Sequence, residues 1–487
     1  MLMKKQYLLE NFEPQRVLKH FEDICGIPHV SGFETALGEH ILGLAKAKGY
    51  DTYRDEAGNI LINVPATPGY EQVAPLLLQG HLDMVNAKDD GVEIDLEKEP
   101  VRLVLEGNIL RADRTTLGAD NAVGLCNMMA LLDADDIRHP PLELLFTVGE
   151  EVGLTGILAF DMSRIKARRM INMDCGDPDC MVIGAAGGAK FRVERTCQSA
   201  PAQGTGMRIV IDGLQGGHSG LEAGKNRGSA IDFGGRLLAA LCDAMPVMLA
   251  GMTSTGAESS LPKDLKLDLV IPAGSVDAAK EICKQHDEMF AGEIAGIEPG
   301  YCMTVTECAV SEAASVEDTR ALADFMLMVP YEVIRRSHLC ADWKLCSALL
   351  ALISYKDGLF SGLFTVRANR NEYRDATVAR AKALCRMTGV SLIPRADYIP
   401  AWPEKEVSPM RELCLAAYQS CFNEDMIVEV EHGTVECGII ANAIPDMDIV
   451  GFAPKSRGAH TTKEHLFVET MAPFWEFLTK ILNSMCA

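Results

Sequence analysis

The first 175 residues alternate between two hydrophobic patterns. Apolar residues recur at helical spacing in three segments, residues 15–25, 31–48 and 119–134. Short apolar runs fill four others, residues 58–64, 75–80, 142–148 and 170–173. These runs predict strands, and the last three resemble strands that are buried on both faces of a sheet. Strands that alternate with helices predict an α/β fold with a mixed, mostly parallel sheet and flanking helices.

Near residue 188 the pattern changes. Apolar and polar residues alternate over 189–196 and 207–212, which is typical of half-exposed antiparallel strands. Helical periodicity and short strands follow in six segments, the helices over residues 228–244, 276–289, 317–328 and 375–387 and the strands over 302–307 and 359–367. This region is therefore predicted to be an α+β domain of about 200 residues, a normal domain size.

The α/β pattern returns after residue 400. The predicted elements are helices over 408–422 and near 468–484, strands over 427–431 and 448–452, and an apolar segment over 435–443. We therefore expect one α/β domain made of residues 1–187 and 400–487, interrupted by an α+β domain of residues 188–399. A chain of 487 residues is also too long for one ordinary hydrophobic core.

The composition is that of a folded globular protein, with 48% hydrophobic and 23% charged residues. The net charge of −22 argues against a nucleic-acid partner, because phosphate backbones attract clustered Lys and Arg. The sequence contains no run of about 18 apolar residues, so we expect no membrane partner. The N-terminus lacks the apolar segment of a secretory signal. The 16 cysteines follow no regular spacing, so we expect reduced thiols in a cytoplasmic protein.

Polar side chains follow three of the predicted buried strands directly. His81 and Asp83 come after residues 75–80, Glu150 and Glu151 after 142–148, and Asp174 after 170–173. Because the carboxyl ends of parallel strands meet at one edge of a sheet, we expect these side chains to converge. Taken singly, each also fits an ordinary role, such as a surface histidine, a solvated glutamate or a turn cap.

Two further segments offer candidate ligands. Asp120 lies between Gly118 and Gly124, where a carboxylate can approach a metal closely or simply cap a turn. His460 and His465 lie near the C-terminus, and each alone is more often a surface residue. Jointly, the histidines and carboxylates supply the nitrogen and oxygen donors of a two-metal hydrolytic site for zinc or another first-row divalent ion.

Six short motifs occur in a specific order: His-Leu-Asp-Met-Val at 81–85, Leu-Gly-Ala-Asp-Asn at 117–121, Gly-Glu-Glu-Val-Gly at 149–153, Asn-Met-Asp at 172–174, Gly-His-Ser-Gly at 217–220 and Gly-Ala-His at 458–460. This set resembles the M20 family of co-catalytic zinc peptidases, from about residue 15 to the C-terminus. Residues 431–438 resemble the aminoacyl-histidine dipeptidase branch of that family.

The resemblance implies a pair of zinc ions, with Co²⁺ or Mn²⁺ as alternatives, bridged by Asp120. His81 and Asp174 would complete one site, and Glu151 and His460 the other. His460 is preferred over the later histidine because the Gly-Ala-His motif contains it. The family also tends to have a cis peptide bond after the bridging aspartate.

The resemblance further implies that Glu150 is the general base and that Asp83 orients the metal-binding histidine next to it. The inserted residues 188–399 would be a lid or dimerisation domain. In that domain, His218 would reach over the active site to stabilise the oxyanion or hold the substrate carboxylate, with Arg367 as a second anion contact.

The function that the resemblance implies is a two-zinc dipeptidase acting on dipeptides with a free N-terminus, of Xaa-His or broad specificity. The partners would be a small peptide substrate and a second copy of the chain in a homodimer. One alternative is another M20 amidohydrolase, a tripeptidase or an aminoacylase. A remote alternative is a non-catalytic binding protein, although every expected ligand and the base are present. Substrate choice stays open, because residues 259–262 read Ser-Ser-Leu-Pro where the branch commonly has Asn-Ala-Ile-Pro.

Overall fold

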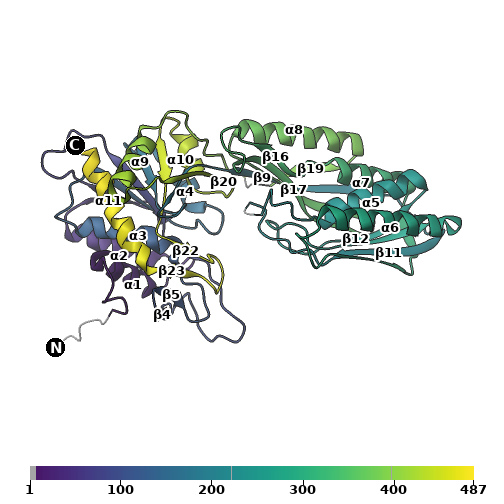
Figure 1. Ribbon diagram of the computed structural model, residues 1–487, viewed down its shortest axis with the longest axis horizontal. Helices are drawn as coiled ribbons and strands as arrows, with labels where there is room; N and C mark the ends of the chain where they lie inside the picture. The colour runs from purple at the N-terminus through teal and green to yellow at the C-terminus, as the bar shows by residue number, and fades with distance from the viewer. Residues whose placement is uncertain (1–6, 221, 396–397, 487) are drawn as a thin grey trace. The chain divides into compact units, whose positions relative to one another are not determined.

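The computed structural model describes residues 7–220, 222–395 and 398–486, and it divides into two compact units (Figure 1). The first unit contains the chain up to Ala185, Trp402–Val430 and the chain from Val435 onward. The second unit contains Ala186–Ala401 and Glu431–Thr434. The interrupted domain predicted from the sequence thus has observed boundaries at 185/186 and 401/402, where 187/188 and 399/400 were predicted.

One short segment departs from the predicted division. Residues 431–434 were assigned to the α/β domain, whereas Glu431–Thr434 belongs to the second unit. The reason lies in side-chain contacts, since His432 Nε2 lies 2.7 Å from Ser347 Oγ and Arg367 Nη1 donates to Thr434 Oγ1. No hydrophobic pattern in the sequence indicates such polar pairings.

The first unit is built on an eight-stranded sheet. In spatial order its strands are β1 (Asp51–Arg54), β2 (Ile60–Val64), β6 (Leu142–Thr147), β3 (Leu76–His81), β7 (Arg169–Asn172), β21 (Asp448–Gly451), β8 (Cys180–Ala185) and β20 (Ile427–Glu431). The central strands β6, β3, β7 and β21 are parallel to one another. Strands β1, β2 and β8 pair antiparallel. The prediction of a mixed, mostly parallel sheet is confirmed in its central strands.

Helices flank this sheet and bury its apolar strands. They are α1 (Gln15–Cys25), α2 (Thr35–Ala47), α3 (Ala119–Asp133), α4 (Thr155–Ala159), α9 (Pro409–Phe422), α10 (Cys437–Ala443) and α11 (Met471–Met485). Helix α3 packs on β3 and on helices α1 and α2, and α9 packs on β21 and α11. Every residue of β3 and β6 is buried, as the unbroken apolar runs predicted.

A smaller antiparallel sheet joins distant parts of the first unit. Its order is β22 (Ser456–Arg457), β23 (His465–Phe467), β5 (Ile109–Ala112) and β4 (Leu103–Glu106). Because β23 pairs with β5, the C-terminal motif is brought beside the segment that leads into α3.

The second unit contains a nine-stranded antiparallel sheet. Its path is β14 (Cys302–Glu307), β11 (Thr205–Asp212), β13 (Leu265–Ile271), β12 (Met248–Thr253), β17 (Lys344–Lys356), β18 (Leu359–Ala368), β9 (Gly187–Thr196) and β19 (Ser391–Pro394), with β16 (Glu332–Arg336) also paired to β17. Strands β10 (Ser199–Pro201) and β15 (Glu312–Ala314) form a separate pair.

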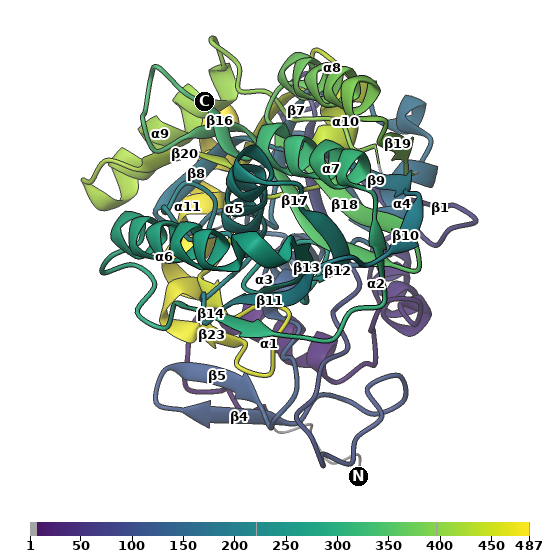
Figure 2. The same ribbon diagram turned by 90° about the vertical axis from the view of Figure 1, so that its right-hand side faces the viewer.

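Four helices of the second unit, α5 (Ala230–Ala244), α6 (Val276–Glu293), α7 (Val316–Met328) and α8 (Asn371–Thr388), lie on one face of that sheet (Figures 1 and 2). Mostly aliphatic side chains, together with several aromatic rings, fill the space between the helices and the strands. The rings of Phe233 in α5 and Phe290 in α6 stack with centroids 4.3 Å apart. The sequence analysis missed β12, β13 and the central strand β17, because β17 is buried over most of its length and lacks the alternation of a half-exposed strand. Among the described residues, every helix is too short or too polar to span a bilayer.

Candidate metal centre

Three neighbouring parallel strands carry the candidate ligands to one edge of the first unit's sheet. Strand β3 ends at His81, β6 ends three residues before Glu150, and β7 ends two residues before Asp174. Asp120 lies in the first turn of α3, and His460 lies between β22 and β23. All of these residues belong to the first unit, so the structure brings the ligand set together within one unit.

His81 and Asp120 form the first half of the centre with Asp174. The Nε2 atom of His81 lies 3.0 Å from Asp120 Oδ1 and 3.2 Å from Asp174 Oδ1. The side chains of His81 and Asp174 are 1% and 8% exposed, whereas that of Asp120 is 24% exposed.

His460 and Glu151 form the second half. The Nε2 atom of His460 lies 2.9 Å from Glu151 Oε2 and 3.3 Å from Asp120 Oδ2. The two carboxylate oxygens of Asp120 therefore face different histidines, which is the arrangement that a bridging ligand requires. His465, the alternative to His460, lies apart in β23, where its Nδ1 contacts the carbonyl oxygen of Lys463.

The donor set fits a pair of divalent cations. Two ligands of a tetrahedral zinc ion, each about 2.0 Å from the metal, lie about 3.3 Å apart, which is close to the distances observed here. The ligand atoms of His81, Asp120 and Asp174 all lie within 4.8 Å of one another, as do those of Asp120, Glu151 and His460. Glu151 Oε1 is buried without a hydrogen-bond partner among the described residues, and a bound cation would satisfy it.

Electrostatics show how strongly the centre attracts positive charge. Burial by itself lowers the pKa of His81, but Asp174, Asp120 and Asp83 reverse that effect and raise this pKa well above its usual value. Hydrogen bonds to Asp120 and Glu151 raise the pKa of His460 to about 11. In the metal-free protein, protonated histidines therefore supply the positive charge that cations would otherwise bring.

The pKa values of two carboxyl groups at the centre are also raised, which disfavours their charged form. Burial, together with the charges of Asp174, Glu436 and Glu151, raises the pKa of Glu150 well above its usual value despite the influence of His81. Burial and the charge of Asp120 raise the pKa of Asp174 to about 6. These carboxyl groups cannot all ionise together without cations, so the protein itself favours metal binding.

Asp83 is fully buried and contacts both neighbouring motifs. The His81 Nδ1 atom lies 2.9 Å from the Asp83 carbonyl oxygen and 3.5 Å from its Oδ1. The Asp83 carboxylate also accepts hydrogen bonds from the backbone N–H groups of Glu150 and Glu151 at 3.0 and 3.2 Å and from Ser31 Oγ at 2.7 Å. Asp83 thus positions the glutamate loop as well as the histidine, a contact that the sequence analysis missed because backbone amides leave no residue pattern.

Glu464 holds the loop that carries Asp120. Its buried carboxylate accepts hydrogen bonds from the backbone N–H groups of Leu117, Gly118 and Asp120 at 2.8 to 3.0 Å. Glu464 lies four residues after His460, so one side chain ties the two ligand-bearing loops together. The peptide bond after Asp120 is cis, as the family resemblance implies.

Three buried polar side chains that the sequence analysis did not single out lie just before the ligands. Gln79, Thr147 and Asn172 occupy the last part of β3, β6 and β7, and each is at most 1% exposed. A sequence signal exists for them, since each is a polar residue inside an otherwise apolar strand.

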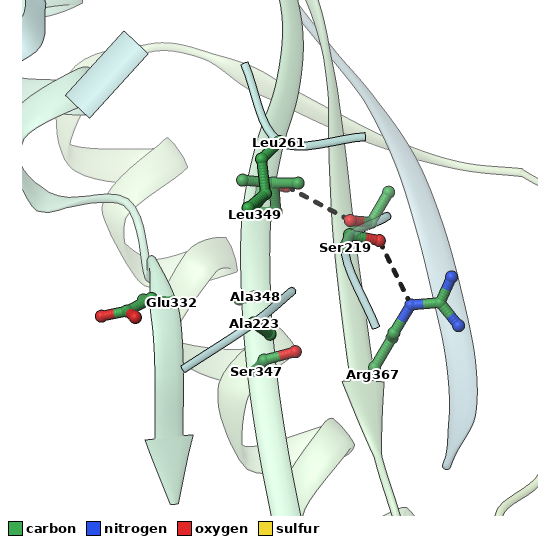
Figure 3. Close-up of a pocket in the computed structure, with 9 residues that line it drawn as sticks. Ser219, Ala223, Leu261, Glu332, Ser347, Ala348, Leu349 and Arg367 are labelled. Carbon is green, nitrogen blue, oxygen red and sulfur yellow. Dashed lines mark hydrogen bonds between the residues drawn. The ribbon is translucent and has the colours of Figure 1, made fainter. Parts of the chain in front are cut away.

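His218 and Arg367 lie in the second unit and form a separate cationic group. Arg367 of β18 donates from Nε to Ser219 Oγ at 3.4 Å (Figure 3), and its Nη2 lies 3.5 Å from His218 Nε2. Its Nη1 donates to Thr434 Oγ1 at 3.2 Å. A cavity of about 10 Å³ lies beside Arg367, large enough for about one water molecule. Glu332 also lines this cavity, but its carboxylate points away from Arg367 in Figure 3.

Arg367 is a partly buried cation without an anionic contact among the described residues. Its hydrogen-bond partners are two hydroxyl groups and an imidazole, and burial lowers its pKa. A buried charge is costly without a counter-charge, so this group suits an anionic ligand.

Comparisons with known proteins give a consistent result. The model of peptidase family M20/M25/M40 matches residues 77–484. The cytosol non-specific dipeptidase of Escherichia coli (strain K12) is 30% identical over 482 residues, which cover 98% of this chain and 99% of the relative. The crystal structure of the aminoacylhistidine dipeptidase from Vibrio alginolyticus superposes with a TM-score of 0.90 at 26% identity, covering 98% of this chain and 97% of that one.

More distant structures share the fold alone. Aminopeptidase PepT from Bacillus cereus has a TM-score of 0.56 at 16% identity and covers 98% of this chain and all of that one. The motif order, the mixed sheet and the match to the family model agree, and the resemblance noted in the sequence is confirmed. The chain belongs to peptidase family M20/M25/M40.

Proposed function

We propose that this protein is a metal-dependent dipeptidase that hydrolyses dipeptides with a free N-terminus. The observation that carries the proposal is the sharing of Asp120 between two histidine–carboxylate groups, one around the buried His81 and one around the exposed His460. Similarity over nearly the whole chain to a non-specific dipeptidase and to an aminoacylhistidine dipeptidase supports the substrate class. The two relatives differ in their named specificity, so both Xaa-His and other dipeptides are candidate substrates.

The residues that would hold two cations are those of the two groups described above. His81, Asp120 and Asp174 would bind one ion, and Asp120, Glu151 and His460 the other. The ions would be zinc, with Co²⁺ or Mn²⁺ as alternatives, since nitrogen and oxygen donors suit all three. Bound ions of this kind polarise the scissile carbonyl and lower the pKa of a water molecule.

Glu150 is the proposed general base. Its side chain meets His81 and Glu151 in a third group of potential ligands, so it lies at the centre. Burial and, to a lesser extent, repulsion by neighbouring carboxylates raise the pKa of Glu150, and bound cations would oppose both effects and favour the carboxylate form. That carboxylate would accept a proton from the attacking water and deliver it to the leaving amine.

Arg367 and His218 are proposed to recognise the C-terminal carboxylate of the substrate. The guanidinium presents a rigid fork of donors that matches a carboxylate. The segment that carries His218 is held by backbone bonds to the Ser-Ser-Leu-Pro segment, from Ser219 N to Ser259 O at 2.7 Å and from Leu261 N to Gly217 O at 2.9 Å. These are backbone bonds, so they do not depend on the side chains of residues 259–262, where this chain differs from the aminoacyl-histidine dipeptidase branch.

Two broader proposals accompany this function. The name of the Escherichia coli relative supports a cytoplasmic location, and the family resemblance supports a homodimer that can be tested by light scattering. The acidic net charge of −22 supports a small peptide rather than nucleic acid as the partner.

Metal removal and a substrate panel test the proposal directly. The zinc-loaded protein is expected to hydrolyse dipeptides, including Xaa-His dipeptides, and to leave N-acylated dipeptides uncleaved. Removal of the metal with a chelator should abolish hydrolysis and lower the melting temperature, and zinc should restore both. Full activity after complete metal removal, measured by metal analysis of the same sample, would refute the proposal. Preferential cleavage of tripeptides or N-acyl amino acids would favour the alternative amidohydrolases.

Zinc binding to the metal-free protein at pH 7 should release protons. Neighbouring carboxylates raise the pKa of His81 well above its usual value and that of His460 to about 11, so both histidines carry a proton in the absence of metal, and each must lose it to bind. The released protons can be counted by calorimetry in buffers of different ionisation enthalpy. Binding that releases no protons would show that the ion binds elsewhere.

Replacement of Glu150 separates catalysis from metal binding. Glu150→Gln should lower kcat by about 10²- to 10⁴-fold, since a general base is lost, while the zinc content stays at the wild-type level. The exposed Glu424 serves as the control, and Glu424→Gln should change neither quantity. Turnover by Glu150→Gln close to the wild-type rate would remove Glu150 from the role of base.

Replacement of Arg367 tests carboxylate recognition. Arg367→Met should raise KM for dipeptides by about 10- to 100-fold, the range expected when a charged hydrogen bond is lost. The variant should also lose the preference for a dipeptide over its C-terminal amide. Arg192→Met, which removes an exposed arginine of β9 in the same unit, is the matched control. An undiminished preference in Arg367→Met would contradict the assignment.

A further inference from the structure

Glu436 is a buried carboxyl group that the mechanism above leaves without a role. It directly precedes α10, lies in the stretch 431–438 that resembles the dipeptidase branch, and is 1% exposed. Its Oε2 atom accepts hydrogen bonds from Thr147 Oγ1 at 2.6 Å and from the side-chain amide of Gln79. The acidic side chain is thus bonded to two strands of the sheet that carries the candidate ligands.

The contacts of Glu436 continue into the third ligand-bearing strand. The Asn172 side-chain amide donates to Gln79 Oε1 at 2.7 Å, and Asn172 Oδ1 accepts from the backbone N–H of Asp174 at 3.1 Å. Glu436, Gln79, Thr147 and Asn172 therefore form one connected network, which we name the Glu436 bridge. It reaches from α10 to the backbone of a proposed metal ligand.

The position of the Glu436 bridge relative to the ligands follows from strand geometry. Gln79 precedes His81 by two residues in β3, so the two side chains point to the same face of the sheet. Thr147 ends β6 three residues before Glu150. The network thus joins β3, β6 and β7 immediately before the point at which each delivers its functional side chain.

Burial of the polar groups of the Glu436 bridge is energetically costly, which indicates a functional role. The bridge buries Glu436 with three polar side chains of the sheet, and the bonds to Glu436 Oε2 offset only part of that cost, because its Oε1 has no hydrogen-bond partner among the described residues. Burial raises the pKa of Glu436 to about 7, and the charges of Asp174 and Asp83 contribute to that rise. The carboxyl group therefore lies within the electrostatic field of the centre.

We propose that Glu436 is a positioning residue that fixes the ends of β3, β6 and β7, and through them the spacing of His81, Asp174 and Glu150. The inference rests on the proposed metal centre, but it assigns a role to a residue that touches neither metal nor substrate. Hydrogen bonds from residues that do not themselves touch the metal commonly set metal affinity and activity by orienting the ligands.

Two replacements of Glu436 separate shape from hydrogen bonding. Glu436→Met removes the acceptor Oε2 and leaves the Gln79 and Thr147 donors with only their longer bonds, from Gln79 Nε2 to Thr147 Oγ1 at 3.3 Å and from Thr147 Oγ1 to the carbonyl oxygen of Gly80 at 3.4 Å. Its affinity for Zn²⁺ is expected to fall by about 10- to 100-fold, with a lower kcat and little change in KM. Glu436→Gln keeps an amide oxygen that can accept both bonds, so it should recover most of the affinity that Glu436→Met loses.

Glu143 provides a matched control at the opposite end of β6. It is 3% exposed, and its carboxylate accepts hydrogen bonds from the backbone N–H groups of Lys166 and Ala167 at 2.9 and 3.0 Å. Glu143→Met therefore removes a comparably buried carboxylate from the same sheet, far from the ligand-bearing edge. It should lower thermal stability without changing zinc affinity.

Zinc affinity measured by competition with a chromogenic chelator, together with melting temperatures of the metal-free proteins, decides the matter. The inference is overturned if Glu436→Met keeps the wild-type zinc affinity and kcat. It is also overturned if Glu143→Met loses as much zinc affinity as Glu436→Met, because Glu436 would then be a purely structural residue. If Glu436→Met does not fold, Thr147→Val removes one donor at constant shape. It should weaken zinc binding less than Glu436→Met would, and an unchanged affinity would overturn the inference.

The same measurements distinguish this inference from the proposed function. A wild-type protein that binds zinc but cleaves no dipeptide refutes the dipeptidase, while the affinities of the variants still decide the role of the Glu436 bridge. A wild-type protein that binds no zinc refutes both.

Discussion

Repulsion among buried carboxylates at one edge of the central sheet is the constraint on which the rest of this structure depends. Parallel strands necessarily bring their carboxyl ends together, and here those ends deliver Glu150, Glu151 and Asp174 beside Asp120. Such a cluster is stable only with positive charge inside it. The histidines provide that charge as protons in the metal-free state, and two divalent cations would provide it more effectively.

Three other buried carboxylates hold the segments that carry the candidate ligands in place. Asp83 and Glu464 accept hydrogen bonds from backbone amides of the ligand-bearing loops, and Glu436 accepts them from side chains of the strands. Each of the three joins segments that are distant in sequence, so the geometry of the centre does not depend on the flexibility of a single loop. An acceptor fixed by donors on two segments is a compact way to set the distance between them.

The division of the chain separates two chemical tasks. The first unit holds every candidate metal ligand and the proposed base, whereas the second holds a partly buried arginine whose contacts are neutral. Glu431–Thr434 belongs to the second unit, so a short segment of the returning chain contributes Thr434 to the contacts of Arg367.

The sequence by itself determined the α/β pattern and the family, because hydrophobic periodicity and short ordered motifs are local properties. The bounds of the insertion and the ligand set stayed predictions, and the ligand set rested on the family resemblance. Strand β17, the amide contacts of Asp83 and the Glu436 bridge were decided only by the tertiary structure. A strand buried on both faces carries no alternation, and a hydrogen bond between residues hundreds of positions apart leaves no local trace. Distances between distant segments, rather than residue types, distinguish a set of candidate ligands from a centre that can bind metal.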